Sequence, residues 1–326
     1  MKILTLDADD VAGACPMKEC IEEMSRSFAL QAKGKIQSPL RTRVAAPAGD
    51  ILVMSSLVRR GRVEGSVKVV SVFPQSKGKR PSISASVLLL DGESGETKAL
   101  IEGASLTAIR TGAVSGLSCR YLARKDSETL GVVGAGAQSF HQVSGVVSEL
   151  RGVKKVKVFS RHRARSKAVA SACAKAFEVD ASAGGSVGEC VRGSDVLVTA
   201  TTSNNPVFDG RTVEEGTHVI AIGAYRPDAR ELDSLLVAGS SVFVDSREAA
   251  LEEAGDLLIP MAEGLISKGS IRAELSELVA GTKKGRSSSP EVTIFKSVGL
   301  AFEDNAAGWL AYRQALRLKL GKWAEL

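Results

Sequence analysis

Residues 129–139, Thr-Leu-Gly-Val-Val-Gly-Ala-Gly-Ala-Gln-Ser, join a short apolar run to a glycine-rich turn and the start of a helical pattern. Glycine at 134 allows a tight turn, and glycine at 136 lets a pyrophosphate approach the backbone at the amino end of the helix. Ser139 replaces the third glycine of the dinucleotide-binding fingerprint, and its small side chain still permits close helix–sheet packing. The stretch therefore predicts a dinucleotide site formed by Gly134, Gly136, Ala137 and Gln138.

The next predicted strand, Val156–Phe159, ends in Ser160-Arg161-His162-Arg163 and carries no carboxylate there. A cofactor with an unmodified ribose 2′-hydroxyl is usually held by Asp or Glu at this place. Arginine suits a phosphate, because its planar fork makes paired, charged hydrogen bonds. We therefore expect NADP(H) to be preferred over NAD(H), with Ser160, Arg161 and Arg163 at the 2′-phosphate; the alternative is a solvated basic helix end.

Further short apolar runs follow at 195–200, 218–222 and 241–244, separated by helical patterns. Strands buried on both faces between helices are typical of a parallel, doubly wound sheet, which binds ligands beyond its carboxyl strand ends. Small residues at those ends leave room for ribose and nicotinamide, although alone they are ordinary turn chemistry. They are Thr199, Ala200, Thr201, Gly223 and Ala224.

The first third of the chain has an α+β pattern. A helix is predicted from Pro16 to Gly34, where proline suits the first turn and glycine the end. Strand-like runs follow, and a helix is expected at 105–122 and another at 300–320 near the end of the chain. The strand-like runs lie at 41–45, 51–55, 67–73 and 83–90, the last joined by a hairpin turn to 97–102.

Length and composition exclude several classes of protein. The chain has 326 residues, 44% of them apolar and 25% charged, which indicates a folded protein of roughly two domains. Its three histidines are too scattered for a paired-histidine zinc site, and we expect no metal. Only 4% of residues are aromatic, which argues against base-stacking recognition of single-stranded nucleic acid.

The net charge of +6 is concentrated in two segments. Residues 151–175 hold nine basic side chains and no acidic one, and residues 59–80 hold seven against Glu64 alone. Anionic ligands, nucleic acid or chance could each explain them. Because no nucleic-acid motif accompanies the basic segments, we expect no nucleic-acid partner.

Cysteine usage and the N-terminal residues bear on location. The five cysteines form no Cys-x-x-Cys pair and are odd in number, which is typical of a cytosolic chain rather than a disulfide framework. The acidic start, MKILTLDADD, does not resemble a signal peptide, and the chain has no run of 18 apolar residues. We expect a cytoplasmic protein with no membrane segment.

Three basic residues stand out on the prospective substrate side. Lys68 lies inside a strand pattern, where it either faces solvent or is buried with a lowered pKa as a proton donor; the pattern alone favours solvent. Arg41 alone would be a surface charge. Arg110, among small and apolar residues, needs an anion, although a structural carboxylate such as Glu102 could serve.

Four segments in order carry a family resemblance: Ala-Ile-Arg-Thr-Gly-Ala at 108–113, Gly-Ala-Gly-Ala-Gln-Ser at 134–139, Gly-Ala-Tyr-Arg-Pro-Asp at 223–228, and Thr-Ile-Phe-Lys-Ser-Val-Gly-Leu-Ala at 293–301 followed by Glu303-Asp304. Together they closely resemble the ornithine cyclodeaminase/mu-crystallin family over essentially the whole chain.

The resemblance implies an α/β fold in which a doubly wound Rossmann domain, 116–300, is inserted into an α+β domain for substrate binding and dimerisation, 1–115 plus 301–326. It implies a homodimer. It places Arg41, Lys68 and Arg110 at the substrate carboxylate, with Lys68 as the residue that protonates or polarises the reacting atom. Further implied contacts are Met54 and Tyr225 at the substrate, and Thr111, Ser297, Val298 and Gly299 at the cofactor.

One departure separates the branches of the family. Cyclodeaminases carry an aspartate two residues after the glycine of the fifth strand, where this chain has Tyr225, with Asp228 three residues further. The resemblance is therefore closest to the ketimine reductase branch, which reduces cyclic imino acids such as pyrroline-2-carboxylate and piperideine-2-carboxylate with NAD(P)H. Alternatives on the same site are ornithine cyclodeaminase, alanine dehydrogenase and a non-enzymatic NADPH-dependent binder of small ligands.

Overall fold

The computed structural model describes residues 2–73 and 83–325. The chain forms two units, which we call unit 1 (Met1–Arg110 with Leu300–Leu326) and unit 2 (Thr111–Gly299). The sequence-based boundaries were 115/116 and 300/301, and this division falls at 110/111 and 299/300. Each unit contains its own eight-stranded sheet.

The sheet of unit 1 is mainly antiparallel. Its order is β16-β1-β7-β6-β5-β4-β2 with β3 paired to β4, and only the β1–β7 pair is parallel among these neighbours. The expected strands are present, several of them longer than expected, whereas the terminal strands β1 and β16 were not anticipated. The strands are β1 Lys2–Leu6, β2 Ile36–Gln37, β3 Thr42–Ala46, β4 Gly49–Arg60, β5 Arg62–Val72, β6 Ile83–Asp91, β7 Thr97–Glu102 and β16 Lys322–Glu325.

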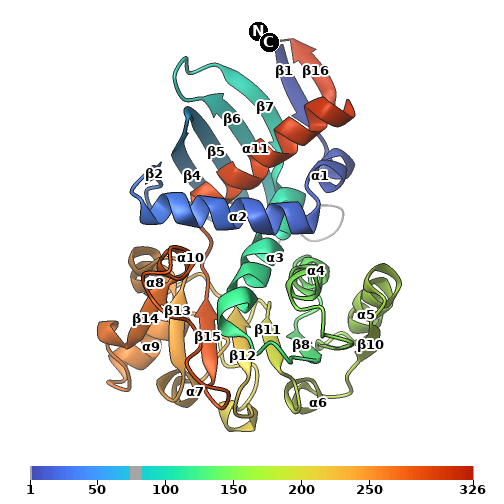
Figure 1. Ribbon diagram of the computed structural model, residues 1–326, viewed down its shortest axis with the longest axis vertical. Helices are drawn as coiled ribbons and strands as arrows, with labels where there is room; N and C mark the ends of the chain where they lie inside the picture. Colours follow the sequence, from blue (N-terminus) through green and yellow to red (C-terminus); the bar gives the residue numbers. More distant parts are fainter. Residues whose placement is uncertain (1, 74–82, 326) are drawn as a thin grey trace. The chain divides into compact units, whose positions relative to one another are not determined.

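Helices α2 (Met17–Ala32) and α11 (Ala301–Leu318) lie across one face of this sheet, beside the short α1 (Ala8–Ala14) (Figure 1). As predicted, α2 begins directly after Pro16. Phe28 of α2 meets Phe302 of α11 edge-on, with ring centroids 5.0 Å apart. These apolar contacts bury the covered face of the sheet.

Strand β5 shows which of its side chains lie on the covered face. Glu64, Ser66 and Lys68 are buried, whereas Val69 is 40% exposed on the other face. Successive residues of a strand point to opposite faces, so residues 64, 66 and 68 share the helix-covered face. The residue-based expectation that Lys68 faces solvent is therefore wrong, because the helix layer covers its face.

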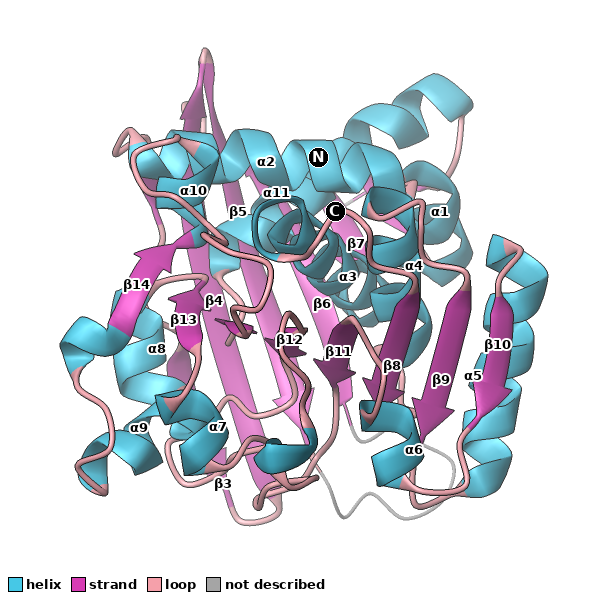
Figure 2. Cartoon of the chain, turned by 60° about the horizontal axis from the view of Figure 1, so that its bottom comes forward, coloured by secondary structure: helices cyan, strands magenta, loops and turns pink. Residues whose placement is uncertain are grey.

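Unit 2 is a doubly wound, parallel sheet, as predicted. Its order is β10-β9-β8-β11-β12-β15-β13-β14, and every neighbouring pair is parallel. Figure 2 shows β8, β9 and β10 side by side and pointing the same way. The strands are β8 Thr129–Val133, β9 Lys155–Phe159, β10 Asp180–Ala183, β11 Val196–Thr199, β12 His218–Ala221, β13 Ser241–Val244, β14 Ile271–Glu274 and β15 Thr293–Lys296.

The strand order of unit 2 reverses direction between β8 and β11. From β8 the chain proceeds to β9 and β10 on one side, and then returns to β11 on the other. Such a reversal leaves a crevice outside the carboxyl ends of the two strands, which is where open α/β sheets bind ligands. The glycine-rich turn after β8 lies at this point.

Helices connect the strands of unit 2, and several short ones begin at a side-chain cap. Ser186, Asp233 and Ser246 accept a backbone N–H at the starts of α6, α7 and α8. No helix within residues 2–73 and 83–325 has both the length and the apolar character needed to cross a membrane. The helices are α3 Gly103–Leu122, α4 Ser139–Glu149, α5 Arg163–Phe177, α6 Val187–Val191, α7 Ser234–Ala238, α8 Arg247–Glu253, α9 Gly255–Ala262 and α10 Leu275–Val279, with 3₁₀ turns η1 Gly210–Thr212 and η2 Lys268–Ser270.

Candidate active site

Two cations and two carboxylates meet in the interior of unit 1. Lys68 Nζ lies 2.5 Å from Asp304 Oδ2, and Arg110 Nε lies 3.0 Å from Asp304 Oδ1. Arg110 Nη1 also lies 2.6 Å from Glu303 Oε2. Lys68 is 2% exposed and Arg110 6%, and both carboxylates are fully buried. We refer to these four residues as the buried charge cluster.

Three elements supply the buried charge cluster. Lys68 lies on the covered face of β5, Arg110 belongs to α3, and both carboxylates lie in the first turn of α11. Acidic side chains are favourable in a first turn, where the helix dipole is positive. Glu102, the alternative partner considered for Arg110, instead accepts the backbone N–H groups of Ala104 and Ser105 at 2.8 Å.

The surroundings of Lys68 make it a weaker base than an ordinary lysine. Burial lowers the pKa of Lys68 to about 8, and the positive charges of Arg110 and Arg41 act in the same direction, whereas Asp304 acts to raise it. Burial alone would raise the pKa of Asp304, but Arg110 and Lys68 hold it below its ordinary value. The cluster therefore holds an ionised carboxylate against an ammonium that loses its proton near pH 8.

Two further predicted substrate residues lie close to Lys68. Met54 is the β4 residue directly opposite Lys68 in the β4–β5 pair, and it is 4% exposed. Arg41 is half-buried just before β3, near enough for its charge to lower the pKa of Lys68. The fold thus brings Arg41, Met54, Lys68 and Arg110 into one region of unit 1.

The glycine-rich turn of unit 2 is crowded at its first glycine and open at its second. Gly134 has φ +119°, and a Cβ there would lie 2.4 Å from the carbonyl oxygen of Ala200. By contrast, a Cβ at Gly136 would meet nothing within 4 Å. Gly136 and Ala137 are exposed before α4, while the Ser139 hydroxyl turns inward to the carbonyl of Gly134 at 3.0 Å. The turn is closed by Gly134 and open at Gly136, as a bound pyrophosphate requires.

The end of β9 lies beside this turn, because Gly134 N donates to Phe159 O at 2.8 Å. Ser160 is half-buried and its hydroxyl lies 2.9 Å from that of Ser166, whereas Arg161 and Arg163 are exposed. The predicted 2′-phosphate residues are thus one hydroxyl and two solvent-accessible guanidinium groups next to the dinucleotide turn.

These features agree with comparisons with known proteins. Residues 1–319 match the model of the ornithine cyclodeaminase/mu-crystallin family. The chain belongs to this family. It is 36% identical to Delta(1)-pyrroline-2-carboxylate reductase of Bacillus cereus over 99% of this chain and 100% of the relative.

Two solved structures of the family share the fold over nearly their whole length. One is Delta(1)-pyrroline-2-carboxylate reductase of Thermococcus litoralis in complex with NADH and L-proline, with 42% identity, a TM-score of 0.94, and coverage of 98% of this chain and 99% of that one. The other is an archaeal alanine dehydrogenase dimer with bound NAD, with 32% identity, a TM-score of 0.92, and full coverage of both chains.

Behind the strand ends of unit 2 lies a carboxylate that sequence reasoning missed. Fully buried Glu231 accepts the Thr199 hydroxyl at 2.9 Å, the N–H and hydroxyl of Thr201 at 2.7 Å each, and Gly223 N at 2.7 Å. The predicted cofactor residue Thr199 is itself fully buried, so its side chain supports the loop from behind. Glu231 thereby joins the ends of β11 and β12, which carry Ala200 and Ala224.

A lysine and an aspartate complete this interior network. Lys296 Nζ lies 2.9 Å from Asp256 Oδ2 and 2.5 Å from the carbonyl oxygen of Ala224, and both charged side chains are fully buried. Asp256 Oδ1 accepts the backbone N–H groups of Glu231 and Leu232 at 2.7 and 2.9 Å. Glu231, Asp256 and Lys296 together fix the backbone that follows β11 and β12, and Lys296 comes from β15.

Asp245, at the end of β13, organises the segment expected to line the nicotinamide. Its Oδ2 accepts the Ser297 hydroxyl and the N–H groups of Val298 and Gly299, each at 2.8 Å. The signal for Asp245 and Glu231 was weak, because a carboxylate just after a short strand or in a loop is normally solvated. For Glu303 and Asp304 the signal was stronger: two acids amid small and apolar residues of a helix imply buried cations.

The region after β12 carries Tyr225 and Asp228, the two positions used above to separate the branches of the family. Tyr225 is half-buried, and Asp228 is exposed and paired with Arg226 at 3.0 Å. Asp228 is therefore engaged at the surface of unit 2. Thr111, the first residue of unit 2, is 7% exposed within α3.

The buried charge cluster should lower the pH at which Lys68 titrates. With lysine labelled at Cε, we expect one NMR resonance to titrate with a midpoint near pH 8, and the Lys68→Arg variant to lack it. Asp304→Asn removes the charge that raises the pKa of Lys68, so the midpoint should fall further. Lys98, whose bond to Glu96 raises its pKa above the ordinary lysine value, should titrate well above Lys68 and serves as the internal control. A Lys68 midpoint above 10 would contradict the account of burial given above.

Proposed function

We propose that the chain is an NAD(P)H-dependent reductase of cyclic ketimine carboxylates, converting pyrroline-2-carboxylate or piperideine-2-carboxylate to L-proline or L-pipecolate. The observation that carries the proposal is the buried charge cluster, with a lysine and an arginine held ready for an anionic substrate. Its support is the 42% identity to a reductase whose structure contains NADH and L-proline. The small-molecule partner is accordingly an imino or amino acid.

The formal charge of the substrate region suits a monocarboxylate. Lys68, Arg110 and Arg41 contribute three positive charges, and Glu303 and Asp304 two negative ones. One substrate carboxylate would neutralise the remainder, so binding lowers the repulsion between cations. Arginine at two of the three positions allows paired hydrogen bonds to the carboxylate. Met54 would contact the ring.

Lys68 is the proton donor in this mechanism. A nicotinamide cofactor, when bound, would supply hydride to the imine carbon, and the imine nitrogen would then need a proton. With a pKa of about 8, the Lys68 ammonium can give up that proton more easily than an ordinary lysine. Asp304 holds the ammonium in place and is itself held by Arg110, so catalysis rests on positioning and charge more than on covalent chemistry.

Two other activities remain as alternatives on the same residues. Alanine dehydrogenase has a specific support, the full-length likeness to the archaeal enzyme with bound NAD. Ornithine cyclodeaminase activity has less support, because Tyr225 stands where cyclodeaminases carry an aspartate and Asp228 pairs with Arg226. A protein that binds NADPH and an imino acid without turnover would be the non-enzymatic alternative.

A substrate screen tests the proposed function. We expect NADPH or NADH oxidation with pyrroline-2-carboxylate or piperideine-2-carboxylate, and none with pyruvate and ammonia; ornithine is followed for proline formation. Because general acids contribute about 10²- to 10⁴-fold, Lys68→Ala should lower kcat by at least about 100-fold while NADPH affinity stays unchanged. Lys98→Ala, at a partly exposed lysine on the same sheet that pairs with Glu96, is the control. Cofactor oxidation with pyruvate and ammonia but with neither cyclic imino acid, or full turnover by Lys68→Ala, would contradict the proposal.

We also propose that NADPH binds more tightly than NADH. The exposed Arg161 and Arg163, with Ser160, support this preference, because two guanidinium groups and a hydroxyl suit a 2′-phosphate. The relatives described above hold NADH or NAD, so the preference is a property we assign to this chain's own β9 end.

Fluorescence titration of both cofactors checks the preference. We expect NADPH to bind at least tenfold more tightly than NADH in the wild type. Arg161→Gln should weaken NADPH binding about tenfold or more and leave NADH unchanged, because a charged hydrogen bond contributes roughly 1.5–3 kcal/mol. Arg165→Gln, an exposed neighbour further along α5, is the control. Equal or tighter binding of NADH would overturn the assignment.

We further propose a cytoplasmic homodimer formed through the open face of the unit 1 sheet. Val67, Leu88 and Leu100 lie opposite one another on β5, β6 and β7, next to Val69 and Leu57 on the same face. Leu57, Val69, Leu88 and Leu100 are 36–40% exposed. Contiguous exposed apolar residues of this kind mark association surfaces, and the archaeal alanine dehydrogenase is a dimer.

Light scattering after size-exclusion chromatography tests the dimer. The wild type should have twice the mass of one chain, and Leu88→Glu should shift it to the monomer because it places a charge at the centre of the apolar patch. Leu235→Glu, at a residue 64% exposed on unit 2, should leave the dimer intact. A monomeric wild type, or a dimer that Leu88→Glu leaves unchanged, would contradict this proposal.

A further inference from the structure

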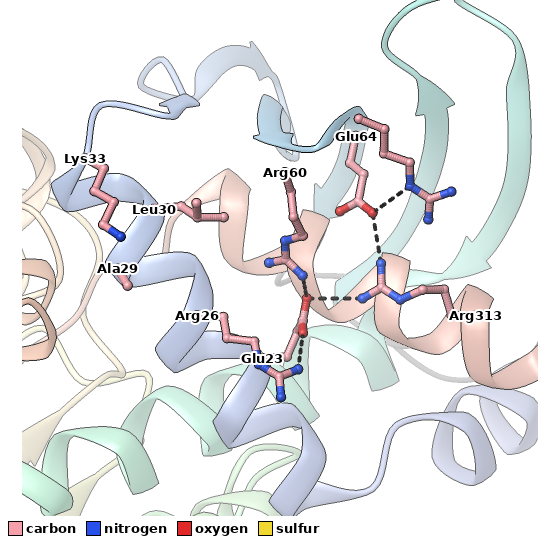
Figure 3. A pocket seen from close by; sticks show the side chains of 9 residues that line it. Glu23, Arg26, Ala29, Leu30, Lys33, Arg60, Glu64 and Arg313 are labelled. Atoms are coloured by element: carbon pink, nitrogen blue, oxygen red, sulfur yellow. Dashed lines mark hydrogen bonds and ion pairs between the residues drawn. The ribbon is translucent and has the colours of Figure 1, made fainter.

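A hollow of about 620 Å³ opens on unit 1 away from the buried charge cluster (Figure 3). It is formed by α2, the β4–β5 hairpin and α11, and none of Lys68, Arg110 or Met54 lines it. Its volume lies within the range of small-molecule sites. The lining residues are Glu23, Arg26, Ala29, Leu30, Lys33, Arg60, Arg62, Glu64 and Arg313.

Two buried carboxylates form the base of this arginine-lined hollow. Glu23 is 1% exposed and is held by Arg60, by Arg313 Nη2 at 3.2 Å and by Arg26 Nη1 at 3.4 Å. Figure 3 shows Arg313 between the two carboxylates, and its Nη1 lies 2.9 Å from Glu64. A buried carboxylate is tolerated only when paired, so these pairs fix the guanidinium groups in position.

Arg62 approaches Glu64 from the other side. Its Nε lies 3.3 Å from Glu64 Oε1, and its guanidinium carbon lies 5.1 Å from the centre of the Trp309 ring. The stacked ring and the carboxylate both restrict the rotation of Arg62. Glu64 is 2% exposed, so Arg62 and Arg313 are held at a fixed carboxylate rather than dispersed in solvent.

The hollow holds more positive charge than its own carboxylates balance. Five basic and two acidic side chains line it, which is a formal excess of three positive charges. Among the described residues, Arg26 reaches a carboxylate only through Nη1 and Arg62 only through Nε, although a guanidinium carries five N–H donors. An ion-pair network that served stability alone would need no such excess.

We propose that this hollow binds a multiply charged oxyanion, a polyphosphate or a tricarboxylate, at a site separate from the reaction. The arginine forks match the paired oxygens of a phosphate or carboxylate group. The excess of three charges matches a ligand that carries several such groups. Ala29 and Leu30 add a short apolar wall on α2.

Titration calorimetry at constant ionic strength, with tripolyphosphate and with citrate as probes, tests the proposal. Saturating NADPH is present, so that the cofactor's own phosphate site is filled. We expect one saturable site per chain, and the tighter of the two probes identifies the class, phosphate or carboxylate. The Arg62→Gln and Arg26→Gln variants should each weaken that binding about tenfold or more, because each loses a charged hydrogen bond.

The matched control is Arg272→Gln in unit 2. Arg272 is 50% exposed and paired with the mostly buried Glu291, much as Arg62 is 55% exposed and paired with Glu64. The Arg272→Gln variant should bind the probe as the wild type does. Both test variants keep Arg313 on the buried carboxylates Glu23 and Glu64. Thermal unfolding midpoints close to that of the wild type would confirm that the variants fold. No saturable binding of either probe, or binding that both test variants leave unchanged, would overturn the proposal whether or not the chain reduces ketimines.

Discussion

The interior of unit 1 is organised by the need to balance buried charge. Lys68 and Arg110 are removed from water, and such cations persist only against carboxylates at short distance. Asp304 contacts both cations and Glu303 contacts the second, so one turn of α11 ties together β5 and α3. Replacing such a cluster by apolar residues is often neutral or stabilising, so the cluster is weak evidence of stabilisation and accords with the proposed chemical role.

Unit 2 uses buried carboxylates in a different way. Glu231 and Asp245 accept hydrogen bonds from hydroxyl and backbone N–H groups of segments that follow the strands, so they tie these loops to the strand ends. Burial raises the pKa of Glu231, an effect that Lys296 opposes. The carboxylates that shape the proposed cofactor side therefore lie behind the strand ends, and the surface in front of them is mostly backbone and small side chains.

The arginine-lined hollow shares elements with the buried charge cluster. Asn305 of α11 donates to the backbone carbonyl of Glu64 at 3.0 Å, and Trp309 donates to that of Gly65 at 3.1 Å. These bonds join α11 to the segment of β5 that leads to Lys68. Strand β5 thus carries Glu64 of the hollow and Lys68 of the cluster, and α11 carries Arg313 of the hollow together with Glu303 and Asp304 of the cluster.

The sequence by itself determined the features that depend on neighbouring residues. Glycine at 134 predicted the tight turn, and its φ of +119° is one that few other residues adopt. The alternation of short apolar strands with helical patterns predicted the parallel sheet. Only the tertiary structure decided that Lys68 is buried. Alternation along β5 shows which residues share a face, but not which face the helices cover. The partner, Asp304, lies 236 residues away in the chain, and no local pattern can bring it there. Glu231 and Asp245 escaped prediction for the same reason, since their role exists only once distant strand ends converge.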